Sequence, residues 1–412
     1  MTEQAKVPAI RFAGFTDPWE QRKLSEVATF GGGHTPPMAD PDNYEDGYVL
    51  WVTSQDVKSN YLDRTTTQIT EKGAKELTLY PAGSLVMVTR SGILRHTLPV
   101  AELRKPSTVN QDIRVILPQG ECCGEWLLQF FISHNKELLL EFGKTGTTVE
   151  SVDFGKIKDM LLYMPSTVEQ QQIGDFFAKL DSLITLHQRK YDKLVILKKS
   201  MLEKMFPKDG ESVPEIRFAG FTDPWEQRKL EDIANRVTRK NEGESDLPLT
   251  ISSQYGLVDQ RTFFNNQVAS KDMSGYYLLR KGEFAYNKST SGDSPWGAVK
   301  RLVRYEKGCV STLYICFGLD GADPDFLVTY YETDRWYKAV QMIAAEGARN
   351  HGLLNIAPND FFDTALILPP SREEQELIGL FFARLDNLIT LHQRKLELLQ
   401  NIKKSLLDKM FA

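Results

Sequence analysis

The sequence carries one 18-residue segment twice. Residues 7–24 read VPAIRFAGFTDPWEQRKL, and residues 213–230 repeat them with a single difference. A second repeat relates residues 173–206 to residues 378–411, which are identical at 23 of 34 positions. The two offsets, 206 and 205, divide the 412-residue chain into two copies of one unit. This period is far too long for a solenoid, so the repeat predicts two similar bodies.

Between the repeated segments of each copy, the two sequences differ almost completely. One faint correspondence survives, because residues 81–83 and 280–282 both end in glycine and precede an apolar stretch. A duplicated enzyme would more often keep its catalytic motifs alike and diverge elsewhere. A duplicated adaptor would keep its docking surfaces alike and let two reading surfaces diverge. The pattern favours the adaptor.

Two long helices are predicted over residues 168–206 and 373–411. A proline and a Ser-x-x-Glu capping-box pattern stand at the start of each. Apolar positions then recur at spacings of three and four, as in a coiled coil. At 1.5 Å per residue each helix would be about 50–60 Å long, so it must join separate bodies or pack against a partner. The predicted seam and docking residues are Ile173, Phe177, Leu180, Ile184, His187 and Leu194 in the first copy, and Ile378, Phe382, Leu385, Ile389, His392 and Leu399 in the second.

The predicted helices have two further features. His187 and His392 occupy equivalent seam positions, where a polar pair that fixes the register is favoured over a metal site or a proton switch. The helices are also basic, although the whole chain has a net charge of −5. Residues 179–208 hold eight Lys or Arg against three acids, and residues 384–412 hold six against three. A solvated flank is the simpler interpretation, and a surface facing DNA or a partner is the alternative.

The divergent middles combine short strand patterns with helical ones. We therefore predict two mixed α/β (α+β) domains, separated by the two long coiled-coil helices. Two similar units with short links can form a pseudo-two-fold arrangement if these helices pack antiparallel. The predicted segments are a first domain at 1–166, a helix at 167–206, a linker at 207–212, a second domain at 213–370 and a helix at 371–412. Strands are predicted at 48–53, 84–89, 113–117, 283–286, 310–317 and 365–368, and shorter helices at 125–140 and 324–345.

Composition excludes several classes of protein. With 41% hydrophobic and 25% charged residues, the chain is not expected to be disordered. No apolar run approaches the roughly 18 residues of a membrane span, and the N-terminus lacks a signal-peptide core, so the expectation is a soluble cytoplasmic protein. The four cysteines fit no disulfide framework or zinc spacing and are expected to be reduced.

Three motifs together resemble the specificity subunit of type I restriction-modification enzymes. They are the FTDPWEQRKL segment, the GGGHTPP…WVTSQD stretch of the first globule, and the P-S-x-x-E-Q…F-F-A-x-L-D-x-L-I start of each long helix. The resemblance covers the whole chain, including the order globule, helix, globule, helix. It implies that each globule is a target recognition domain that reads one half of a split DNA sequence. It also implies that the helices act as a fixed spacer and dock two methyltransferase subunits, and that a separate motor-nuclease subunit completes the complex.

The same resemblance implies a non-catalytic chain that binds no cofactor or metal. S-adenosylmethionine, ATP and Mg²⁺ would then lie on the partner subunits. Because the two reading surfaces differ, the DNA target is expected to be asymmetric. Trp19 and Trp225 lie in the near-identical segments and are therefore predicted to be buried packing residues rather than platforms for bases.

Polar loop residues are the candidates for reading DNA, because Arg, Lys, Asn, Gln, Ser and Thr bind base edges. For each single residue, an ordinary polar loop is the alternative. In the first globule the candidates are Thr53, Ser54 and Gln55; Arg90, Ser91, Arg95 and His96; and Lys144, Thr145 and Thr147. In the second globule they are Ser253 and Gln254; Asn287, Lys288, Ser289 and Ser291; and Arg349, Asn350 and His351.

Catalytic motifs are weak by comparison. Gly143-Lys144-Thr145 ends like a Walker A loop, but Leu138 occupies the position of its first glycine. Asp42, Asp56 and Lys58 form a loose pattern that could hold Mg²⁺ in a stand-alone nuclease, and the second copy lacks it at the equivalent place. A scaffold whose globules bind two proteins is a third, weaker alternative.

Overall fold

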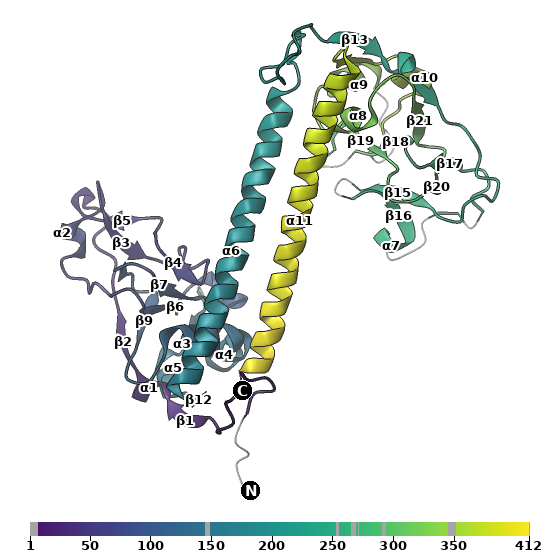
Figure 1. Ribbon diagram of the computed structural model, residues 1–412. Coiled ribbons are helices and arrows are strands. Elements are labelled where there is room, and N and C mark those ends of the chain that lie inside the picture. Colours follow the sequence, from purple (N-terminus) through teal and green to yellow (C-terminus); the bar gives the residue numbers. More distant parts are fainter. Residues whose placement is uncertain are drawn as a thin grey trace. The chain divides into compact units, whose positions relative to one another are not determined.

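The computed structural model describes residues 7–144, 149–252, 255–264, 269–270, 272–290, 294–344 and 352–411. The chain divides into two compact units, each described here by itself. Unit 1 comprises Met1–Gln188 and Arg394–Ala412, and unit 2 comprises Arg189–Gln393. Figure 1 shows the helices α6 (Thr167–Lys204) and α11 (Arg372–Met410). Each helix is divided between the two units, at Gln188 in α6 and at Gln393 in α11. Both predicted long helices are therefore confirmed, with ends within two residues of the expected ones.

The described part of unit 1 contains a five-stranded sheet in the order β2-β9-β6-β7-β4 and a three-stranded sheet in the order β5-β3-β8. Two ribbons, β1-β12 and β10-β11, accompany them. The strands are β1 (Glu20–Lys23), β2 (Ala28–Gly32), β3 (Val49–Val52), β4 (Tyr61–Leu62), β5 (Gln68–Ile69), β6 (Leu85–Val88), β7 (Val100–Leu103), β8 (Thr108–Val109), β9 (Ile113–Pro118), β10 (Gly143–Lys144), β11 (Ser151–Val152) and β12 (Leu161–Met164). The short helices are α1 (Leu24–Val27), η1 (Pro41–Asn43), α2 (Glu71–Ala74), η2 (Gly92–Arg95), α3 (Gly124–Ser133), α4 (Asn135–Phe142) and α5 (Phe154–Asp159).

The described part of unit 2 contains a four-stranded sheet in the order β14-β21-β18-β19 and the ribbons β13-β22, β15-β16 and β17-β20. Its strands are β13 (Glu226–Lys229), β14 (Ala234–Arg236), β15 (Leu249–Ser252), β16 (Gly256–Asp259), β17 (Tyr277–Arg280), β18 (Phe284–Asn287), β19 (Ala298–Arg301), β20 (Lys307–Val310), β21 (Ile315–Leu319) and β22 (Ala365–Leu368). Its short helices are η3 (Leu230–Asp232), α7 (Gln260–Phe264), α8 (Pro324–Tyr330), α9 (Tyr337–Ile343) and α10 (Pro358–Phe362).

Four strands recur in the same order in both units, although their sequences differ. The order β2-β9-β6-β7 of unit 1 matches β14-β21-β18-β19 of unit 2, with antiparallel neighbours throughout. Gly83 and Gly282 precede the equivalent strands β6 and β18, with φ of 88° and 95°, a conformation that favours glycine. Their N–H groups bond to the carbonyls of Leu103 and Leu302. The faint sequence correspondence at these glycines therefore marks a shared mixed α/β fold.

In each unit, the core includes residues of both long helices. Phe177 of α6 contacts Phe411 just beyond α11, with ring centroids 6.2 Å apart, in the same cluster as Trp126. In unit 2, Phe206 just beyond α6 contacts Phe382 of α11, also at 6.2 Å. Within each unit the start of one helix thus lies beside the end of the other, so the helix halves run antiparallel.

Three predicted elements are interrupted in the structure. The helix expected at 125–140 breaks at His134, because the amide of Asn135 is hydrogen-bonded to the backbone of Leu98. The helix expected at 324–345 ends at Tyr330, whose carbonyl accepts the hydroxyl of Thr333. The strand expected at 310–317 is divided by a turn between β20, which pairs with β17, and β21, which pairs with β14 and β18. The spacing of apolar residues did not reveal these breaks, because side-chain hydrogen bonds and strand pairing define them.

Two expectations from composition can be compared with the described residues. Cys122, Cys123, Cys309 and Cys316 are all free thiols, as expected. Within the described ranges, no helix combines the length and the apolar character needed to cross a membrane.

Candidate nucleic-acid interface

The lead segment of unit 1, residues 7–24, joins the ends of both long helices. The N–H of Ile10 bonds to the carbonyl of Lys409 near the end of α11, at 2.9 Å. Arg11 holds Glu169 in the first turn of α6 through two hydrogen bonds of 2.8 and 2.6 Å. Strand β1 of the same segment pairs with β12, directly before α6. The segment therefore bridges the start of its own helix and the end of the other copy's helix.

The lead segment of unit 2, residues 213–230, makes the same joint. Ile216 bonds to the carbonyl of Lys204 near the end of α6 at 2.9 Å, and Arg217 holds Glu374 of α11 at 2.6 and 2.8 Å. Strand β13 pairs with β22, directly before α11. Because the repeated parts of the sequence meet at these joints, the contacts account for their likeness while the segments between them diverged.

The arginine–glutamate pairs are buried. The side chains of Glu169 and Glu374 are 1% and 0% exposed. The hydrogen bond with Glu169 raises the pKa of Arg11 above its ordinary value, outweighing the opposing effect of burial. The capping-box prediction is therefore half right. The hydroxyls of Ser166 and Ser371 accept the expected N–H groups at 3.4 and 3.5 Å, but the carboxylates bind the lead-segment arginines instead of reaching back.

The next residues of the motif hold the head of each unit, meaning its residues outside α6 and α11. The side-chain oxygen of Gln170 accepts the N–H of Cys123 before α3, and that of Gln375 accepts the N–H of Asp323 before α8, both at 2.9 Å. Gly174 and Gly379 then allow these head helices to approach closely. A Cβ at Gly379 would lie 2.6 Å from a backbone nitrogen of α8. A glycine near the start of each long helix is therefore required for this close packing.

The tryptophans of the lead segments are buried, as predicted. Trp19 and Trp225 are 5% and 4% exposed. Trp19 makes an edge contact with Trp126 at 6.4 Å between ring centroids, and Trp225 makes one with Phe206 at 5.7 Å. Buried rings cannot stack on bases, so these residues stabilise the joint.

In unit 1, backbone hydrogen bonds connect the three segments that carry candidate reading residues. Asn110 donates its N–H to Val52, directly before Thr53. Thr89, directly before Arg90, donates to Asp112 and accepts the N–H of Val152. The ends of β3, β6 and β11 are therefore linked along one edge, which we name the reading edge of unit 1. Figure 1 shows the strands of this unit.

The reading-edge side chains differ in availability. Gln55, Arg90 and His96 are exposed, and none makes a side-chain hydrogen bond to another described residue. Arg95 bonds to Glu150 at 2.5 Å, and Lys144 pairs with Asp153 at 2.9 Å. The remaining predicted residues include Thr53, which bonds to Asp56, and the half-buried Ser54 and Ser91, whereas Thr145 and Thr147 lie outside the described residues.

Unit 2 has an equivalent edge after β18. Ser289 forms a bridge with Leu353, and Thr290 bonds to Gly352, much as Arg90 bridges to Ser151 in unit 1. Lys288 donates to the carbonyl of Ile356 at 3.2 Å, and burial lowers its pKa. The remaining predicted residues are Asn287, which accepts the N–H of Ser289, and Ser253, Gln254, Ser291, Arg349, Asn350 and His351, which lie outside the described residues.

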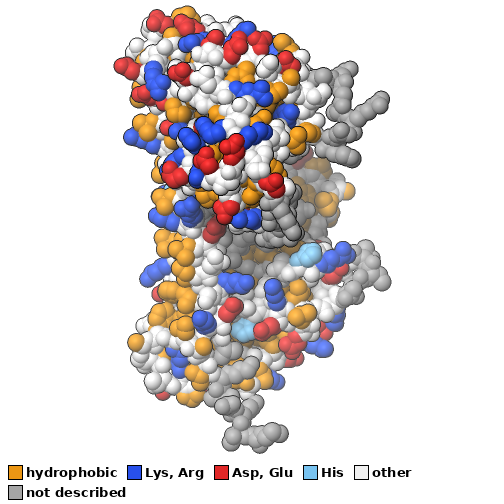
Figure 2. Space-filling view, turned by 90° about the vertical axis from the view of Figure 1, so that its right-hand side faces the viewer, with side chains coloured by type: hydrophobic (Ala, Val, Ile, Leu, Met, Phe, Trp, Pro, Cys, Tyr) orange, Lys and Arg blue, Asp and Glu red, His pale blue; other side chains and the backbone are white. Residues whose placement is uncertain are grey.

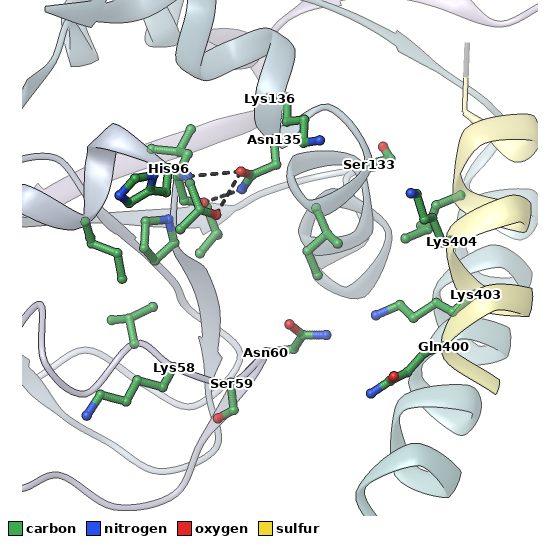
Figure 3. Close-up of a pocket in the computed structure, with 18 of the residues that line it drawn as sticks. Lys58, Ser59, Asn60, His96, Ser133, Asn135, Lys136, Gln400, Lys403 and Lys404 are labelled. Atoms are coloured by element: carbon green, nitrogen blue, oxygen red, sulfur yellow. Dashed lines mark hydrogen bonds between the residues drawn. The ribbon is translucent and has the colours of Figure 1, made fainter. Parts of the chain in front are cut away.

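A crevice of about 860 Å³ opens between the head of unit 1 and α11 (Figure 3). Its head wall includes Asn60 and His96, and its helix wall includes Gln400, Lys403 and Lys404. Figure 3 shows Lys403 reaching from α11 toward Asn60. The crevice thus separates part of the reading edge from the helix.

A second crevice, of about 460 Å³, lies between the head of unit 2 and α6. Its helix wall includes Lys198, Lys199 and Leu202, which correspond in the repeat to Lys403, Lys404 and Leu407 of the first crevice. Its head wall includes Tyr331 and Glu332. The helix walls are therefore alike, whereas the head walls differ.

Beside the first crevice lies a buried ion pair between the helices. Lys403 of α11 donates to Asp181 of α6 at 2.6 Å, and the side chains are 11% and 9% exposed. Asp181 also accepts the amides of Asn60 at 2.9 Å and Gln129 at 3.4 Å, both from the head. This carboxylate thus joins the head to both helices.

Unit 2 contains the corresponding pair. Lys198 of α6 donates to Asp386 of α11 at 2.6 Å and to Glu332 of the head at 2.7 Å. Burial alone would lower the pKa of Lys198, but Glu332 and Asp386 outweigh it and raise the pKa. Burial and the neighbouring Glu332 raise the pKa of Asp386. None of the four helix residues of these ion pairs was predicted from the sequence. The available signal was that the same charged residues stand at equivalent positions of the repeated helices.

The predicted seam residues face inward. Nine of these twelve residues belong to the apolar core of their own unit or pack against it. The fully buried ones are Ile173, Phe177, Leu180, Ile378, Phe382 and Leu385, and the partly buried ones are Ile184, His187, Leu194, Ile389, His392 and Leu399.

Other apolar side chains remain exposed on the helices. Leu183 and Leu186 of α6 are 47% and 46% exposed, and the equivalent Leu388 and Leu391 of α11 are 44% and 45% exposed. Repetition of the same exposed residues distinguishes them from scattered surface leucines. On the face shown in Figure 2, Lys and Arg are interspersed with Asp and Glu rather than gathered into one basic tract.

Both aspartates of the nuclease alternative have other partners, whereas Lys58 is exposed. Asp42 pairs with Lys72 at 2.9 Å. Asp56 accepts hydrogen bonds from the backbone and hydroxyl groups of Thr53 and Thr66, at 2.7 to 2.8 Å. Partial burial would raise the pKa of Asp56, but these bonds outweigh it and lower the pKa. Among the described residues, no group of three or more His, Cys, Asp or Glu side chains is arranged to hold a metal ion. Asp56 therefore closes a turn.

Comparison with known proteins adds independent findings. Residues 16–195 match the family described as type I restriction modification DNA specificity domain. The specificity subunit of the type I restriction enzyme EcoR124I/EcoR124II from Escherichia coli is 29% identical over 186 residues, covering 42% of this chain but less than half, 46%, of that relative. The MjaIX specificity subunit from Methanocaldococcus jannaschii is 24% identical over 416 residues, covering 95% of this chain and 92% of the relative.

A solved structure supports the fold. The S subunit of a type I restriction-modification system from M. genitalium matches with a TM-score of 0.58 at 12% identity, over 99% of both chains. At this identity the match speaks for the fold alone. The mixed α/β heads and long helices are therefore features shared with that protein.

Proposed function

We propose that this chain, which belongs to the family of type I restriction-modification specificity subunits, reads a bipartite, asymmetric DNA target with its two heads. Each head would read one half-site, and α6 and α11 would fix the gap between the half-sites. At 38 residues, α6 is about 57 Å long, enough to hold two readers of half-sites that lie roughly 34–36 Å apart.

One observation carries the proposal: the two units share one architecture but present different side chains at the equivalent edge. The same four-strand order and the same lead-segment joint occur in both units. At the equivalent edge, unit 1 presents Arg90 where unit 2 presents Ser289. Side chains that contact the edges of the bases determine which bases a protein recognises. Different residues at equivalent positions of the two units therefore favour two different half-sites.

The test is to exchange one head. Replacing residues 25–160 by the corresponding segment of a relative with another target is expected to change one half of the methylated sequence, because those residues carry the reading edge but not the joint. Methylome sequencing of cells that contain the chain and its partners measures the motif. Exchanging residues 7–24 for 213–230 is the control and should leave the motif intact. A head exchange that altered both halves would contradict independent reading.

The exposed leucines support a docking role for the helices. Two copies of one surface suit two copies of one partner, so we propose that each pair docks one methyltransferase subunit. Replacing Leu183 and Leu186 by Asp is expected to weaken partner binding about tenfold, because apolar area that would be buried becomes charged. The Leu388 and Leu391 variant should act equally. Co-purification and sedimentation measure the stoichiometry, with Val303→Asp on the head as the exposed control. Unchanged binding by both double variants would exclude this surface.

The chain itself is proposed to be non-catalytic. S-adenosylmethionine, ATP and Mg²⁺ would be bound by the methyltransferase and motor-nuclease subunits of the assembled complex. The turn-closing bonds of Asp56 support this division of labour, since they engage the carboxylate on which the nuclease alternative depends.

A further inference from the structure

The two interhelical ion pairs are one feature repeated. Asp181 and Asp386 are 205 residues apart, and so are Lys198 and Lys403. In unit 1 the pair is Asp181 with Lys403, and in unit 2 it is Asp386 with Lys198, each at 2.6 Å. We name each pair a socket. The sockets are built from identical residues at equivalent positions on the long helices.

The two heads engage their sockets with different chemistry. In unit 1, the amide of Asn60 donates to the socket aspartate at 2.9 Å. In unit 2, the carboxylate of Glu332 accepts from the socket lysine at 2.7 Å. One head thus supplies a neutral donor to the acid, and the other supplies an acid to the base. The two sockets are therefore alike, whereas the contacts that each head makes with its socket differ.

Hydrogen bonds and packing connect Asn60 to the part of the reading edge that carries Gln55. Asp56 ties Thr53 to Thr66 through its four hydrogen bonds, and Val57 next to it is buried. The carbonyl of Asn60 also accepts the N–H of Glu102, a residue of strand β7 in the five-stranded sheet, at 2.8 Å. The turn that carries Gln55 is therefore fixed at both ends, and the bond from Asn60 to Asp181 transmits the position of the helix to it.

We propose that Asn60 and Glu332 are positioning residues that fix the heads on the sockets and so set how strictly the complex measures the gap between half-sites. This inference rests on the proposed function. It assigns the choice of bases to the reading edges and the strictness of spacing to the socket contacts. A loosened head would still recognise its half-site but would accept it over a wider range of positions.

The first test is Asn60→Ala in the assembled complex. Methylation is measured on DNA with the native half-sites and with gaps of the native length and one base pair shorter or longer. The preference for the native gap is expected to fall about tenfold, or about 1.4 kcal/mol, because a hydrogen bond to a buried charge is lost. The preferred bases within each half-site should stay unchanged. Gln400→Ala is the control, since Gln400 lines the same crevice, whereas the side-chain hydrogen bonds to Asp181 within the described residues come from Asn60, Gln129 and Lys403.

Glu332→Gln is an independent second test, because it weakens the other head's contact while Lys198 keeps Asp386. It should lower the gap preference in the same way, and Glu332→Asp should restore part of it. Thermal unfolding of every variant identifies loss of folding separately. Gap preference unchanged in both folded variants would overturn the inference. Failure of the wild-type complex to require any split target would instead overturn the proposed function, so the two failures are distinguishable.

Discussion

Arg11→Ala is expected to lower the free energy of unfolding by ~3–5 kcal/mol, because it leaves the carboxylate of Glu169 buried without its partner. Arg11 supplies both side-chain hydrogen bonds to this carboxylate, which is 1% exposed. The same change also releases the lead segment from the start of α6. Arg217→Ala should have a similar effect through Glu374, whose side chain is 0% exposed. Denaturant unfolding followed by circular dichroism measures both.

The matched control is Arg95→Ala. Arg95 bonds to Glu150 at 2.5 Å, but its side chain is 64% exposed, so water can take its place and its loss should cost much less than the loss of Arg11. Adding Glu169→Gln to Arg11→Ala should recover part of the stability, because a neutral amide is less costly to bury than an unpaired charge. Equal effects of Arg11→Ala and Arg95→Ala would show that burial does not govern the joint.

Insertion of seven helical residues into both long helices, after Gln188 and after Gln393, is expected to lower methylation of the native target at least about a hundredfold. Seven residues preserve the heptad seam and add about 10.5 Å. At roughly 3.4 Å per base pair, activity should reappear on a target whose gap is about three base pairs longer. The half-site bases should not change, because neither the heads nor the sockets are altered. Methylation of a set of targets with graded gaps measures the shift.

Insertion into α6 alone is the control for this experiment. It would offset one helix against the other and is expected to disturb the socket pairs rather than produce a new gap preference. If the double insertion left the preferred gap at its native length, the helices would not fix the distance between the half-sites.

Much of the architecture could be predicted from the sequence, because its signals are local and repeated. The apolar spacing of α6 and α11 persists over many turns, so tertiary context cannot easily obscure it. Gly83 and Gly282 indicated equivalent turns, because few residues other than glycine adopt the positive φ that both have. The burial of Trp19 and Trp225 followed from their identity within two otherwise different copies.

The candidate site was less accessible to sequence analysis. The three segments of the reading edge in unit 1 were identified separately, but nothing local indicated that they are linked through Asn110, Thr89 and Asp112. Polarity also failed to distinguish Arg90, which is exposed, from Lys288, which turns to a backbone carbonyl. The direct contacts with DNA remain predictions.

The sequence by itself determined the duplication, the two long helices and the division between repeated frame and divergent heads, since periodicity and identity are properties of the chain alone. Only the tertiary structure decided that Arg11 pairs with Glu169 and that Lys403 pairs with Asp181. Those partners are separated by 158 and 222 residues. Burial makes such pairs energetically important, and burial exists only once distant segments have packed together.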